Sequence, residues 1–117
     1  MLRPSSTLAL LLAALVFHCT GCCTEEPSLE SATAINNRTI EASCGQCQLG
    51  LPGTGCDLAI LVDGIAYYVD GSGIDDHGDA HGKDGLCNVV RNARATGTIV
   101  AGRFNAEMLE ILPGPGR

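Results

Sequence analysis

Apolar and polar residues alternate after about residue 38, and this alternation predicts β-strands. Ile40, Ala42 and Cys44 are separated by polar residues, which is typical of a first strand with one buried face. The clearest pattern covers residues 58–69, where the apolar runs LAILV and IAYYV flank Asp63-Gly64. Since both positions of a tight two-residue turn need positive φ, this Asp-Gly pair predicts a β-hairpin.

One helix is predicted in the second half of the chain. Asp84 is a favourable N-cap residue, because its carboxylate can accept hydrogen bonds from free amides at a helix start. The apolar residues that follow it fall at helical spacing on one face: Leu86, Val89, Val90 and Ala93. Residues 70–83, before this helix, are rich in Gly and Asp without a steady period, and they predict a long loop.

The predicted order is three strands, a short helix and two strands. The last two strands cover residues 95–100 and 104–112 and turn at Ala101-Gly102. This is the order of elements in the five-stranded OB-fold barrel, whose short helix lies between strands 3 and 4, although other small β-barrels and α+β folds share it. We therefore expect a β-rich, OB-like domain at residues 39–112 and a disordered tail at 113–117.

The beginning of the chain has a different character. A short positive start at Arg3 precedes an unbroken apolar run from Leu8 to Phe17. This run is too short for a membrane-spanning helix, which needs about 20 residues, but it is typical of a secretory signal peptide. We therefore expect residues 1–21 to be a signal peptide and the protein to be exported.

Cys22 is the expected site of lipid attachment. Gly21-Cys22 follows the apolar run and resembles the lipobox of bacterial lipoproteins, in which the signal is cut before a cysteine that carries diacylglycerol. The alternatives are ordinary signal cleavage nearby and a retained leader. Residues 22–38 are polar and predict a flexible tether. The expected location is the cell envelope or periplasm, with the membrane as partner through the lipid anchor.

Composition excludes several classes of function. The net charge is −6 at pH 7, aromatic residues make up 3% of the chain, and there is no Trp. Clustered positive charge and base-stacking side chains are therefore missing, and no nucleic-acid partner is expected. No G-x-S-x-G motif and no Gly-rich phosphate loop is present, so we expect binding without catalysis.

Four cysteines lie inside the predicted domain, namely Cys44, Cys47, Cys56 and Cys87. Small domains often need cross-links, and an exported protein meets an oxidising environment that favours disulfides. The expected pairs are Cys47–Cys56 across a loop and Cys44–Cys87 between the first strand and the helix. The alternative is a metal centre of four thiolates, since Cys44-x-x-Cys47 has ligand spacing. A thioredoxin-like role is not expected, because this motif follows a strand and enters a Gly-rich loop.

A second cluster combines acidic residues with histidine, in the segment Asp75-x-His77-x-Asp79-x-His81. Alternate residues of an extended segment share a face, so two imidazoles and two carboxylates would converge. Such donors suit zinc, copper or nickel, and a divalent-metal site is therefore predicted here. The alternative is a solvated acidic loop in which the Asp side chains cap turns.

These motifs resemble an uncharacterised family, a domain of unknown function, of small exported bacterial lipoproteins. The likeness covers about residues 39–112 and rests on C-G-Q-C-Q-L-G, G-C-D-L-A-I, Y-V-D-G and I-D-D-H-G-D-A-H…D-G-L-C. The positions that match the pattern are Cys44, Cys47, Cys56, Asp75, Asp76, His77, Asp79, His81 and Cys87. The resemblance implies a shared structural or binding centre and no known activity.

The sequence thus predicts a membrane-anchored, non-enzymatic envelope protein that binds zinc or copper through the Asp-His segment. The alternative is a purely structural or protein-interaction module held together by two disulfides.

Overall fold

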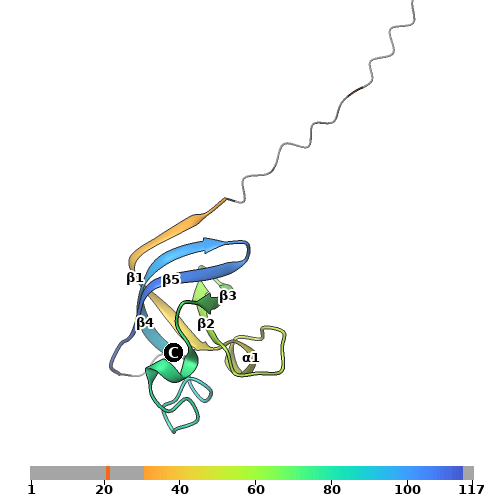
Figure 1. The fold of residues 1–117 in the computed structure, drawn as a ribbon. Coiled ribbons are helices and arrows are strands. Elements are labelled where there is room, and N and C mark those ends of the chain that lie inside the picture. The colour runs from red at the N-terminus through yellow and green to blue at the C-terminus, as the bar shows by residue number, and fades with distance from the viewer. Residues whose placement is uncertain (1–20, 22–30, 115–117) are drawn as a thin grey trace, which may run out of the picture.

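The computed structural model describes residue 21 and residues 31–114. Within this part, five strands form a closed barrel (Figure 1). The elements in chain order are β1 (Thr33–Cys44), α1 (Gly45–Gln48), β2 (Leu58–Val62), β3 (Ile65–Asp70), the 3₁₀ turn η1 (Ile74–His77), β4 (Arg91–Val100) and β5 (Arg103–Ile111). The predicted signal peptide and the lipidation site Cys22 lie outside the described residues. None of the helices described is long and apolar enough to cross a membrane.

The barrel has the strand order of an OB-fold. Its strands follow one another as β1-β2-β3-β5-β4, and β4 returns to β1. Neighbouring strands are antiparallel except β3 and β5, which run parallel with Tyr68 opposite Arg103. This order matches the five-stranded Greek-key barrel. The prediction of a small, β-rich, OB-like barrel is therefore confirmed.

Both predicted tight turns are present. Asp63 and Gly64 have φ of 50° and 84° and join β2 to β3, with Val62 opposite Ile65. Ala101 and Gly102 have φ of 51° and 70° and join β4 to β5. In each case both turn residues have positive φ, which matches the right-handed twist of the flanking strands.

The helix predicted after Asp84 is wrong. Residues 81–88 form turns and β4 begins at Arg91, so Ala93 lies in a strand opposite Ile40 of β1. The apolar residues here belong to two patterns: Leu86 anchors a loop, whereas Ala93, Ala95 and Ile99 are buried at alternate positions of β4. The short helix between the third and fourth strands is instead η1, earlier in the chain.

Strand β1 starts earlier than predicted. Residues 33–38 were expected to be part of the tether, but they belong to β1, and all except Asn36 and Asn37 pair with β4. Thr33 lies opposite Ile99. Ile35 is 3% exposed and belongs to the core. The ladder shifts register between Ile35 and Arg38, next to Asn37 with φ of 45°. This irregularity interrupts the alternation and explains why the sequence pattern becomes visible only from residue 39.

Small residues let the barrel close around one large side chain. Phe104 and Ile60 are fully buried. A Cβ at Gly97 would lie 2.1 Å from Asn105 O and 2.8 Å from the Phe104 ring, so the backbone and the ring occupy that space. Alanines with no exposed surface line the interior at Ala42, Ala93 and Ala95. Because the interior is filled by side chains, a binding site is expected at an end of the barrel. In Figure 1, α1 and the β3–β4 connection lie at the lower end.

Candidate metal centre

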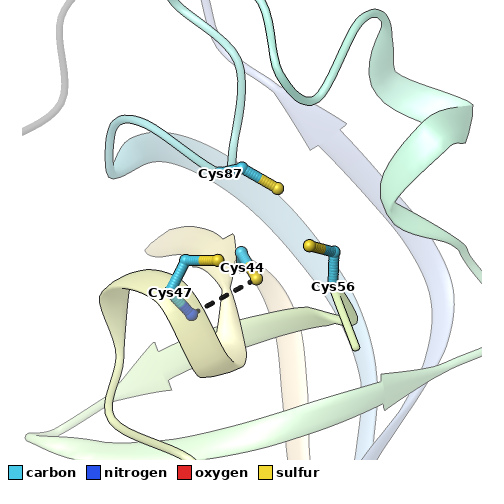
Figure 2. A group of neighbouring side chains, drawn as sticks. All are labelled: Cys44, Cys47, Cys56 and Cys87. Carbon is cyan, nitrogen blue, oxygen red and sulfur yellow. Dashed lines mark hydrogen bonds between the residues drawn. The ribbon is translucent and has the colours of Figure 1, made fainter. Parts of the chain in front are cut away.

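Four cysteine side chains converge at this end of the barrel. The Sγ atoms of Cys44, Cys47, Cys56 and Cys87 all lie within 4.8 Å of one another (Figure 2). They come from the end of β1, from α1, from the loop before β2 and from the loop before β4. All four are free thiols. The predicted disulfides Cys47–Cys56 and Cys44–Cys87 are therefore not formed in this structure.

The C-G-Q-C motif folds as one helical turn rather than as the start of a loop. Cys44 is the N-cap of α1, with φ −67° and ψ 125°, and its Sγ accepts a hydrogen bond from Cys47 N at 3.4 Å. Gly45 has no room for a side chain, since a Cβ would lie 2.6 Å from Tyr68 Cε1 and 3.2 Å from Ala59 Cβ. The turn is thus pressed against β2 and β3, and this contact fixes two of the four sulfurs.

Cys56 is held near α1 through its neighbour Asp57. Gly45 N donates to Asp57 O at 2.8 Å, and Asp57 N donates to Gln46 Oε1 at 3.0 Å. Gln46 Nε2 also donates to Asp57 Oδ2 at 2.6 Å. Three hydrogen bonds therefore close the loop back onto the helical turn.

Cys87 is held by bonds to β1 and to its own loop. Cys44 N donates to Leu86 O at 2.9 Å, and Cys87 N donates to Ala80 O at 2.9 Å. The fully buried Ser43 Oγ lies 2.7 Å from Leu86 O. Cys44 and Cys87 are 0% and 8% exposed, whereas Cys47 is exposed and Cys56 is partly exposed. The cluster is buried on one side and faces solvent on the other.

The thiols are close enough to perturb one another's ionisation. Burial disfavours the Cys44 thiolate, but hydrogen bonds from Cys47, Gln46 and Cys87 outweigh burial and lower its pKa. The hydrogen bond with Cys44, followed by burial, raises the pKa of Cys47 to about 11. Burial, followed by contact with Cys56 and Cys44, raises the pKa of Cys87 to about 12. One thiolate therefore disfavours the others, and a cation at the centre would relieve this repulsion.

The separations suit tetrahedral coordination. A Zn–S bond of about 2.3 Å places the sulfurs of a tetrahedral site about 3.8 Å apart. The upper limit of 4.8 Å in the structure therefore requires the sulfurs to move inward by no more than about 1 Å. Four thiolates from a C-x-x-C turn and two loops form the ligand set of a closed structural zinc site.

The predicted Asp-His centre is not assembled. Within residues 31–114, the cysteine cluster is the one group of three or more potential ligands that converge. His77 Nε2 is hydrogen-bonded to Ser72 Oγ at 2.8 Å. Asp79 Oδ1 accepts from His81 N at 3.0 Å, as in a turn cap. Asp75 and His77 lie in η1, and Gly78 with φ of 98° follows, so the segment is not extended and its alternate residues do not share a face.

His81 nevertheless lies beside the cysteine cluster. Its Nε2 is 3.8 Å from Cys56 Sγ. In the sequence His81 shares a motif with His77, and no local pattern indicates its contact with a cysteine 25 residues earlier. The C-x-x-C spacing indicated the four-thiolate alternative. It did not show that Cys56 and Cys87 lie next to Cys44 and Cys47.

A polar cleft of about 610 Å³, which sequence reasoning missed, borders the cluster at Cys56. Tyr68, Ser72 and Arg103 are among the residues that line it. Arg103 makes two hydrogen bonds of 2.8 Å to Asp70, and its guanidinium carbon lies 5.6 Å from the centre of the Tyr68 ring. This ion pair and the ring fix the wall of the cleft formed by β3 and β5.

A closed five-stranded barrel with four converging thiols at one end defines a small OB-like protein with a candidate metal centre. The chain belongs to DUF6370, a family of unknown function whose model matches residues 38–112. The match includes the whole cluster and the Asp-His segment, and it confirms the expected membership in a domain family of unknown function. No curated protein and no solved structure matches the chain.

Proposed function

We propose that the protein binds one divalent transition metal, zinc first of all, through Cys44, Cys47, Cys56 and Cys87. The observation that carries this proposal is the convergence of all four Sγ atoms within 4.8 Å. Two separate disulfides need only pairwise contacts, whereas a four-fold contact around one point is the arrangement a tetrahedral ion requires. Soft thiolate donors suit zinc and also copper(I).

The proposed role is binding without catalysis. Catalytic zinc sites keep one coordination position open for water or substrate, whereas four protein thiolates fill a tetrahedral ion. Two of the ligands are also buried, which restricts solvent access to the ion from that side. The metal would therefore hold α1 and two loops together at the end of the barrel.

The test is a metal and thiol count on the full-length chain purified from an oxidising compartment. Native mass spectrometry is expected to show one zinc per chain, and alkylation of the unfolded protein with chelator should label all four cluster cysteines. Cys44→Ala should abolish the bound zinc. Two disulfides with no bound metal would overturn the proposal and favour the second candidate, a structural or interaction module cross-linked by Cys47–Cys56 and Cys44–Cys87.

We further propose that the protein is exported to the cell envelope and anchored to the membrane through lipid on Cys22. The apolar run from Leu8 to Phe17 and Gly21-Cys22 support this proposal. The mass of the mature N-terminal peptide tests it, since cleavage before Cys22 and a diacylglyceryl adduct are expected. Cys22→Ser should remove the adduct, whereas Cys23→Ser should leave it unchanged. An unmodified Cys22 in the membrane fraction would contradict the anchor.

A further inference from the structure

His81 carries a potential ligand atom that the cysteine cluster does not use. Its Nε2 lies 3.8 Å from Cys56 Sγ, and its side chain is outside the group of four converging sulfurs. His77, the other histidine within residues 31–114, is instead hydrogen-bonded to Ser72. A neutral imidazole nitrogen is, like a thiolate, a standard zinc ligand. The His81 imidazole therefore lies next to Cys56, one of the four candidate ligands, without belonging to the ligand set itself.

The backbone of His81 belongs to the same loop as one of the buried ligands. Cys87 N donates to Ala80 O at 2.9 Å, directly before His81. His81 O accepts from Asn88 Nδ2 at 3.0 Å, and His81 N donates to Asp79 Oδ1 at 3.0 Å. These bonds fix the backbone on both sides, while the residue itself is exposed. The imidazole can thus rotate toward the cluster about a fixed Cα.

Cys56 is the cluster cysteine next to both His81 and open space. Cys44 and Cys87 are buried, and Cys47 is held in α1 by the bond from its N–H to Cys44 Sγ. Cys56 is partly exposed and lines the cleft of about 610 Å³. Its loop contains Gly53 and Gly55, which reduce its stiffness. A thiolate that left the metal here would enter the cleft rather than a packed interior.

We propose that His81 is a reserve ligand that replaces Cys56, so that the centre exchanges between four-thiolate and three-thiolate, one-imidazole coordination. This inference rests on the proposed metal-binding function. In the exchange the metal–sulfur bond to Cys56 breaks, a metal–nitrogen bond to His81 Nε2 forms, and the released thiolate takes a proton from water without any electron transfer. Four thiolates leave zinc with two negative charges, and a neutral imidazole in place of one thiolate removes one of them.

The exchange gives the metal a defined side for entry and exit. With Cys56 released into the cleft, the coordination sphere opens toward the cleft, in addition to the exposed side at Cys47. The buried Cys44 and Cys87 keep the ion bound meanwhile. The centre is then suited to transferring its metal to a small thiol or amine carrier, whereas a purely structural site retains its ion.

Cobalt(II) is the probe for the test, because its sulfur-to-metal charge-transfer band reports the number of thiolates. The full-length chain carries Cys19→Ser, Cys22→Ser and Cys23→Ser, so that the cluster supplies the only thiols. Cys56→Ala should retain cobalt with one thiolate fewer and a nitrogen ligand. The matched variant Cys47→Ala removes the exposed thiolate of α1, whereas the contact of His81 is with Cys56. It should bind cobalt at least about tenfold more weakly than Cys56→Ala, a difference of about 1.4 kcal/mol.

His81→Ala added to Cys56→Ala should lower the cobalt affinity at least about tenfold below that of Cys56→Ala alone. Losses of this size are usual when a side chain that supports a metal site is removed. His77→Ala in the same background is the control and should change nothing. Equal affinities of the Cys56→Ala and Cys47→Ala proteins, with no effect of His81→Ala on either, would overturn the reserve-ligand proposal. Failure of the parent chain to bind cobalt or zinc would instead overturn the proposed function itself.

A second measurement needs no cysteine variant. When the zinc-loaded parent chain is treated with iodoacetamide and mapped by mass spectrometry, Cys56 should be the first cluster cysteine alkylated. His81→Ala should slow this labelling at least about threefold while leaving zinc stoichiometry at one, since the released thiol then loses its replacement. Labelling that begins at Cys47, or that is unchanged by His81→Ala, would contradict the exchange at Cys56.

Discussion

At the scale of single residues, the absence of a side chain positions the cluster. Gly45 lies between two cysteines of the C-x-x-C turn and directly against Tyr68 and Ala59. Any Cβ there would force α1 away from β2 and β3, and Cys44 and Cys47 would move with it. The residue that sets the sulfur positions therefore carries no ligand atom.

Gly45→Ala is expected to lower the free energy of unfolding by about 1–3 kcal/mol, the usual cost of overpacking a filled site. It should also weaken zinc binding, because two of the sulfurs shift. Gly73→Ala is the matched control, since its Cβ would lie 3.4 Å from its nearest neighbour, an ordinary contact. Urea unfolding with and without zinc measures both effects, and equal midpoints for the two variants would show that α1 adjusts freely.

At the scale of elements, local chemistry made some parts of the fold predictable. Asp63-Gly64 forms the predicted turn because two positive φ angles are required there and the sequence supplies residues that tolerate them. The helix prediction was wrong because Leu86 and Ala93 are both buried but in different structures. Leu86 lies in a loop and Ala93 in a strand, and their helical spacing is therefore a coincidence. That distinction depends on β1, whose Cys44 N–H binds Leu86 O, and no local pattern contains this contact.

The candidate site was predictable to a similar extent. The sequence identified all four cysteines and their two candidate states, because the C-x-x-C spacing and the number of cysteines are local facts. The expected pairs Cys47–Cys56 and Cys44–Cys87 are not formed in this structure, and the helix expected at Cys87 does not form either. The contact between His81 and Cys56 depends on how two loops fold against each other, and hydrophobic pattern carries no information about it.

The early start of β1 yields a prediction for this element. Ile35→Ala should lower the free energy of unfolding by about 2–4 kcal/mol, because it removes a buried side chain from the core. Asn36→Ala, at the exposed neighbouring position, should change it by less than about 0.5 kcal/mol. Thermal or urea unfolding separates the two. A neutral Ile35→Ala would mean that residues 33–38 contribute little to the fold.

The ion pair between β3 and β5 should contribute less to the free energy of unfolding than the buried Ile35 does. Asp70 and Arg103 side chains are 44% and 48% exposed, so their two hydrogen bonds are screened by water. Arg103→Met is expected to cost less than about 1 kcal/mol, and less again at high salt. Unfolding midpoints at low and high ionic strength give the result. A large loss of stability that does not depend on salt would show that packing of Arg103 on Tyr68, rather than the ion pair, stabilises the contact between β3 and β5.

At the scale of the whole molecule, the cluster joins segments that the barrel alone leaves as loops. Metal that binds only the folded chain stabilises it by about 4 kcal/mol when its free concentration is 1,000 times Kd. We therefore expect a chelator to lower the unfolding temperature and zinc to restore it. Cys87→Ala should remove this zinc dependence, whereas His77→Ala should retain it. Unfolding curves that coincide with and without zinc would contradict a metal ion that holds these segments together.

If Cys22 carries lipid as proposed, the position of Thr33 at the start of β1 limits where the protein can act. With lipid on Cys22, only a short length of chain separates the membrane from the barrel, and even fully extended it reaches no more than about 40 Å. The domain would then diffuse in two dimensions within a thin layer above the bilayer. It would encounter other molecules attached to the same membrane far more often than molecules free in bulk solution.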